Sequence, residues 1–152
     1  MRTMLSKDLE AAKKIMRKEK ASLVIVKDGA LIYVGRRHGL LDLAEAVKLL
    51  GEALRGSAVA DRVVGKAAAT VFAYWSFNSV YGGLMSIHAA KILEKAGIAY
   101  EYDYMVPVIK GRKGGEICPF EKLVLGLDDV ETAYRILARK LGIEGAGVEL
   151  SI

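Results

Sequence analysis

Asp61 and Lys66 are the residues whose types and spacing first point to chemistry. Asp61 follows the short apolar run Ala58 to Ala60, and Lys66 interrupts an otherwise apolar helical pattern. Because an aspartate favours the position just before a helix, we predict a buried strand that ends at Asp61 and a helix from Arg62 to about Trp75. Asp61 would either orient the amino or hydroxyl groups of a ligand or simply cap that helix. Lys66 would either contact an anionic ligand near the helix N-terminus or pack its stem on the core with its ammonium in solvent.

Glycines accompany these residues and mark a second junction between a strand and a helix. Gly65 is predicted either to allow close packing or to let a ligand approach the backbone. Gly82, Gly83 and Ser86 follow the next apolar run, where backbone amides would either bind an anion or form an ordinary tight turn. Consecutive parallel strands end at one edge of a sheet, so we expect both junctions to contribute to one ligand site.

Cys118 is the only cysteine, and it directly precedes a helix that is predicted to start at Pro119. A thiol at a helix N-terminus, next to the basic loop from Met105 to Ile117, would act as a nucleophile or redox group. The alternative is a small apolar side chain in a cap position. His38 and Gly39 lie in a basic turn that we expect to approach the same site.

These residues need a scaffold in which strands alternate with helices. Asp-Gly at positions 28–29 joins two β-branched runs and predicts a hairpin. Apolar residues at helical spacing predict a helix over 40–54, with Asp42 and Glu45 among its solvent-facing residues. The other predicted elements are a helix over 6–19, a strand over 79–81, a helix over 87–95, a strand over 99–104, and helices that start near Pro119 and Asp128.

This order predicts an α/β fold, a three-layer α/β/α sandwich with a mixed sheet, an antiparallel N-terminal hairpin and parallel right-handed crossovers. We divide the chain into an N-terminal helix extension, residues 1–20, and a single domain, residues 21–152. At 152 residues the chain is long enough to bury a substantial core.

The composition of the chain limits the classes of function that it could have. No charge-free run approaches the roughly 18 residues that a membrane span needs, and one cysteine excludes an internal disulfide. We therefore expect a cytoplasmic protein with no membrane association, and the single asparagine and absence of glutamine are typical of a thermophilic source. The net charge is +5, and residues 1–20 carry seven Lys/Arg against three Asp/Glu. That basic helix contains no aromatic residue, so a solvated helix face is favoured over nucleic-acid binding.

Three segments resemble a small prokaryotic family of unknown function in the cytidine-deaminase-like superfamily. They are Leu-Val-Ile-Val-Lys-Asp-Gly at 23–29, Ala-Asp-Arg-Val-Val-Gly-Lys-Ala-Ala-Ala at 60–69, and Ile-Cys-Pro-Phe-Glu at 117–121. Zinc deaminases carry His-x-Glu or Cys-x-Glu at the first helix after the hairpin, and Pro-Cys-x-x-Cys at the next junction. Here His38-Gly39-Leu40 lacks the glutamate, and the segment from Asp61 to Gly65 lacks cysteine. We expect no bound zinc, no zinc-dependent deamination and no cofactor.

The resemblance implies a pocket where the zinc deaminases have theirs, at the carboxyl edge of the strands. We expect it to bind a nucleotide-like or other small anionic ligand, with or without a non-hydrolytic reaction. The alternative is a structural or interaction module whose basic N-terminal helix binds a protein partner or nucleic acid. A homodimer is expected, because the superfamily commonly assembles through its helical layer and the helix after Asp61 is apolar on several faces.

Overall fold

The computed structural model describes residues 2–111 and 115–146, with side chains from residue 7 onward. Its centre is a five-stranded sheet in the order β2-β1-β3-β4-β5. The strands are β1 (Leu23–Lys27), β2 (Ala30–Gly35), β3 (Ala58–Val64), β4 (Ser79–Ser86) and β5 (Ala99–Val106). β1 pairs antiparallel with β2 and β3, whereas β3, β4 and β5 are parallel. The predicted mixed sheet is therefore confirmed.

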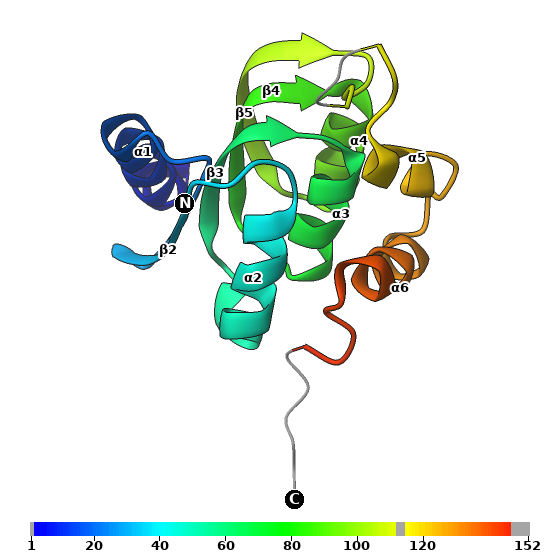
Figure 1. Ribbon diagram of the computed structural model, residues 1–152. Helices are drawn as coiled ribbons and strands as arrows, with labels where there is room; N and C mark the ends of the chain where they lie inside the picture. The colour runs from blue at the N-terminus through cyan, green and yellow to red at the C-terminus, as the bar shows by residue number, and fades with distance from the viewer. Residues whose placement is uncertain (1, 112–114, 147–152) are drawn as a thin grey trace, which may run out of the picture.

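Helices cover both faces of the sheet, as Figure 1 shows. Helix α1 (Arg2–Glu19) lies on one face, and α2 (Leu41–Leu50), α3 (Lys66–Tyr74) and α4 (Ile87–Lys95) lie on the other. A 3-10 turn, η1 (Gly51–Leu54), follows α2, while α5 (Pro119–Val124) and α6 (Val130–Leu141) pack on α3. The three-layer α/β/α sandwich is confirmed, and the helix that we treated as an N-terminal extension supplies one of its layers.

Two hydrophobic clusters hold these layers together. Leu9, Ala12 and Met16 of α1 are buried against one face of the sheet, where Val24 and Tyr81 belong to the same cluster. The second and larger cluster lies under α2, α3 and α4, and Phe72 is fully buried in it. In the described part of the chain no helix is both long and apolar enough to cross a membrane.

The junction after β3 differs from the prediction. β3 does not end at Asp61 but continues to Val64, and α3 starts at Lys66 rather than at Arg62. The strand continues because its neighbours offer partners: Val63 and Val64 pair with β4, and the Arg62 amide donates to the Ser22 carbonyl. Asp61 therefore lies within a strand, and Gly65 takes the cap position of α3. β4 likewise runs to Ser86 rather than stopping at position 81.

Several local predictions are confirmed. Asp28 and Gly29 turn the hairpin with φ angles of 50° and 80°. Ser86 caps α4 by accepting from the Ala89 amide at 3.0 Å, and Asp129 caps α6 by accepting from the Thr132 amide at 3.0 Å. Part of the basic loop before Cys118, residues 112–114, lies outside the described residues, as do the side chains of residues 1–6.

Candidate functional site

A pocket of about 300 Å³ lies at the carboxyl end of β3. Five segments form it: the start of β1, the loop between β2 and α2 with the first turn of α2, the end of β3, the start of α3, and the segment that leads into α5. Of the residues predicted for a ligand site, the pocket is lined by His38, Gly39, Asp61, Gly65 and Cys118. The apolar part of its lining includes Leu40, Leu43, Ile109 and Phe120.

The N-terminus of α3, which borders this pocket, is closed by a carboxylate of the protein itself. Glu121 is buried, and its two oxygens accept from the amides of Lys66 and Ala67, each at 2.7 Å. A Cβ at Gly65 would lie 2.5 Å from this carboxylate, so glycine is needed there. The favourable anion position of the helix is thus occupied by Glu121. The sequence marks Glu121 only as an acid in the first turn of its own helix.

Lys66 does not line the pocket. Its side chain is buried, its ammonium donates to the Leu125 carbonyl at 2.9 Å, and Asp128 lies 3.8 Å away. These contacts tie α3 to the turn between α5 and α6. The second junction is also separate: Gly82 would contact Val64 if it carried a Cβ, and Ser86 caps α4. Gly83 borders a different hollow, on the face that carries α1.

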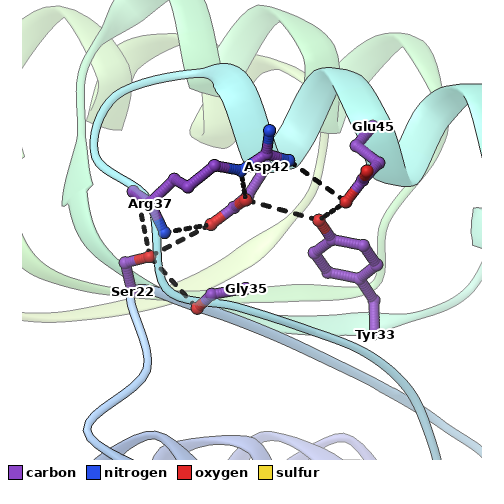
Figure 2. Close-up of polar contacts among 6 residues, drawn as sticks. All are labelled: Ser22, Tyr33, Gly35, Arg37, Asp42 and Glu45. Atoms are coloured by element: carbon purple, nitrogen blue, oxygen red, sulfur yellow. Dashed lines mark hydrogen bonds and ion pairs between the residues drawn. The ribbon is translucent and has the colours of Figure 1, made fainter.

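The loop that carries His38 and Gly39 is fixed by Asp42, which Figure 2 shows at the centre of a polar network. Asp42 is buried and accepts from the Arg37 amide at 2.8 Å, the Arg37 guanidinium at 2.7 Å and the Ser22 hydroxyl at 3.2 Å. A Cβ at Gly35 would overlap the Asp42 carboxyl. The prediction that Asp42 faces solvent is therefore wrong, because the loop folds back over the start of α2.

Tyr33 and Glu45 extend this network outward (Figure 2). The Tyr33 hydroxyl donates to Glu45 at 2.6 Å, and the Arg37 guanidinium bridges to Glu45 at 3.1 Å. Burial and the hydrogen bond to Glu45 raise the pKa of Tyr33, while the hydrogen bond to Asp42 raises the pKa of Arg37. The wall of the pocket is consequently held by hydrogen bonds that reach from β2 to the second turn of α2.

Asp61 is the polar group of the pocket that the protein leaves nearly unpaired. Its carboxylate accepts from the Val63 amide at 3.3 Å, and no ion pair reaches it from the described residues. Desolvation is the largest cause that raises the pKa of Asp61 to about 8, and the nearby charge of Asp42 adds to it. Near neutral pH the carboxyl therefore holds a proton and can both donate and accept a hydrogen bond.

Cys118 lines the same pocket from the cap position of α5. It is half-buried, and its amide donates to the Ile109 carbonyl at 3.1 Å, which closes the loop behind it. Within the described ranges, no three His, Cys, Asp or Glu side chains are grouped so that they could hold a metal ion. Glu121 is engaged by two amides, so the side chains present do not fit the zinc centre of a deaminase.

The sandwich and the pocket together define an α/β domain with a pocket at the carboxyl end of its central strand, β3. Residues 11–141 match the family model described as "Domain of unknown function (DUF1893)", and the chain belongs to that family. The predicted resemblance is thereby confirmed.

A DUF1893 family protein from Thermotoga maritima is similar at 35% identity with a TM-score of 0.81, over 88% of this chain and 90% of that chain. The dCMP deaminase of cyanophage S-TIM5 is similar at 15% identity with a TM-score of 0.46, over 66% of this chain and 97% of that chain. No curated protein matches the sequence.

Proposed function

We propose that the pocket at the end of β3 binds a nucleotide-like small molecule. The observation that carries this proposal is Asp61, a carboxyl directed to a cavity and left without an ion-pair partner in the described part of the chain. Its pKa is raised to about 8 mainly by desolvation, which destabilises the native state unless something compensates. A ligand that hydrogen-bonds the carboxyl would supply that compensation.

The walls of the pocket favour a flat, apolar-faced ring. Leu40 and Leu43 approach from α2 and the loop before it, while Ile109 and Phe120 approach from the segment that leads into α5. A volume of about 300 Å³ is at the small end of ligand pockets, which fits one heterocycle better than an extended molecule. A protonated carboxyl at the end of such a slot matches the adjacent donor and acceptor groups on the edge of a nucleobase.

An anionic group of the ligand would lie at the mouth of the pocket rather than at the start of α3. Glu121 already occupies the α3 amides, and Lys66 is turned toward Leu125. The basic side chains that line the pocket are Arg37, His38 and Arg62, and the Arg37 side chain is 50% exposed although it pairs with Asp42 and Glu45. Phosphate would therefore be held at the exposed side of Arg37 and by the loop around His38.

The experiment is calorimetric titration of the wild-type chain with nucleobases, nucleosides and nucleoside monophosphates, alongside two matched variants. Asp61→Ala should weaken binding of the best ligand at least about tenfold, because the methyl group can neither donate nor accept a hydrogen bond. Asp128→Ala, an equal change at a side chain that is 96% exposed, should bind like the wild type. Equal affinities of the two variants, or no binding by any compound, would overturn the proposal.

A further inference from the structure

The sheet face that carries α1 holds a second hollow, whose lining shares Arg62 with the pocket at the end of β3. Helix α1 packs on β1, β3 and β4. The hollow beside its C-terminus measures about 460 Å³. Its lining consists of Met16, Arg17, Lys20, Arg62, Tyr81, Gly83, Leu84, Asp103 and Tyr104.

An exposed aromatic ring stands at the edge of this hollow. Tyr104 is 72% exposed, and it pairs in register with Leu84, which lines the hollow beside it. Gly83 adds no side chain to this lining, and its backbone packs closely on Arg62, because a Cβ there would lie 2.9 Å from the Arg62 carbonyl oxygen. A flat apolar row with a tyrosine at its end therefore faces solvent.

Three cations surround the same row. Arg17 and Lys20 come from the last turn of α1 and the residue after it, and Arg62 comes from β3. Among the described residues none of the three forms an ion pair, although the Arg62 guanidinium donates to the Ala21 carbonyl at 3.0 Å. The hollow thus presents positive charge that the described part of the chain does not neutralise.

Acids close to this row are engaged elsewhere. The Glu101 carboxylate is held by Lys13 at 2.9 Å, and the Glu19 carboxylate is held by Arg36 at 3.0 Å. Asp103, the acid within the lining, accepts a hydrogen bond from the Tyr81 hydroxyl. Three cations therefore share the lining with one carboxylate, Asp103, and the lining keeps a net positive charge toward an external anion.

We propose that this face binds single-stranded nucleic acid, with a base stacked on Tyr104 and phosphates held by Arg17, Lys20 and Arg62. Single strands bind where a positively charged groove runs beside an aromatic platform, and this hollow combines both. In the sequence, the lack of an aromatic residue in the basic N-terminal helix argued against nucleic-acid binding. The fold supplies the missing ring from β5, more than 80 residues further along the chain.

The test measures fluorescence anisotropy of labelled oligo-dT and oligo-U of about 16 nucleotides, over a range of salt concentrations. The double variant Arg17→Glu, Lys20→Glu should bind at least about tenfold more weakly and show a shallower salt dependence, because two phosphate contacts are lost. A matched double variant, Lys91→Glu with Lys140→Glu, makes the same charge change on the opposite helical layer. Its affinity for the oligonucleotides should fall much less. Urea unfolding of each variant checks that the fold is intact.

Variants of Tyr104 distinguish base stacking from electrostatic attraction. Tyr104→Ala should weaken binding at least about fivefold with an unchanged salt slope, and Tyr104→Phe should restore it. Three results would overturn the proposal: equal losses in the two double variants, no effect of Tyr104→Ala, or binding to vesicles of anionic lipid in place of the oligonucleotides.

Discussion

Asp42 and Asp61 lie close enough for their charges to interact, yet their surroundings are opposite. Asp42 is enclosed by donors from the loop after β2 and from Ser22, so that both of its oxygens accept hydrogen bonds. Asp61 has one amide at 3.3 Å and a cavity in front of it. The first carboxylate is satisfied by the protein, and the second is not.

This difference separates a scaffold residue from a candidate binding residue. A buried carboxylate with complete hydrogen bonding stabilises the geometry of its neighbours, and here it fixes the loop that carries His38. A carboxyl that is desolvated without partners raises the free energy of the native state, so its presence in a cavity needs another explanation. Ligand binding is the explanation that the cavity offers.

Matched amide substitutions test this contrast most strongly. Asp42→Asn should lower the free energy of unfolding by about 3 kcal/mol, because the new NH2 group would face either the amide or the guanidinium donor of Arg37. Asp61→Asn should not lower the free energy of unfolding at pH 7, since it removes an ionisable group that burial disfavours. Urea denaturation of both variants gives the comparison. An equal loss in the two variants would assign Asp61 to the scaffold as well.

A second test, with a smaller expected effect on stability, concerns the contact between Gly35 and Asp42. Gly35→Ala should destabilise the protein by about 2 kcal/mol, because the added methyl group would overlap the buried carboxyl and push the loop outward. Gly126→Ala is the control, since nothing lies within 4 Å of a Cβ at that position. The control should stay within about 0.5 kcal/mol of the wild type in the same denaturation assay. Similar values for the two alanine variants would contradict the tight packing around Asp42.

The same contrast explains how far the sequence could predict this molecule. The hairpin at Asp28 and Gly29 and the starts of the helices after Ser86 and near Asp128 depend on interactions within a few residues, and these were predicted correctly. The end of β3 depends instead on pairing with β4, which a strand pattern followed by a helix-like pattern does not reveal.

The roles of two acids were hidden for the same reason. Asp42 contacts Ser22 across 20 residues of sequence, and Glu121 caps α3 across 55 residues. Each sits at a helical position where an acid normally faces solvent, so local spacing gives no sign of burial. Asp61 and Cys118 were placed in one site from the topology of parallel strands, and they do line one pocket. Lys66 was expected there from helix position alone, and its side chain points the other way.

The last test follows the proton of Asp61. Its pKa is raised from 3.8 to about 8, so the native carboxyl keeps its proton over a range where the unfolded chain releases it. This contribution to stability is complete below pH 3.8 and is lost as pH rises through about 8. Between pH 5 and 7 the free energy of unfolding of the wild type should therefore fall, relative to Asp61→Asn, by about 1 kcal/mol per pH unit. That slope lies below the limit of about 1.36 kcal/mol per pH unit, because the unfolded chain still binds a fraction of a proton near pH 5 and the native carboxyl begins to release its proton near pH 7. Arg55 lowers the pKa of Glu52, and Thr132 lowers the pKa of Asp129. These two groups change the pH dependence of stability only below their ordinary pKa values of 4.5 and 3.8, which lie below the range from pH 5 to 7.

Parallel urea-denaturation curves of wild type and variant at each pH measure the difference in the free energy of unfolding. A difference that stays constant with pH would show that Asp61 is ionised like a surface carboxylate.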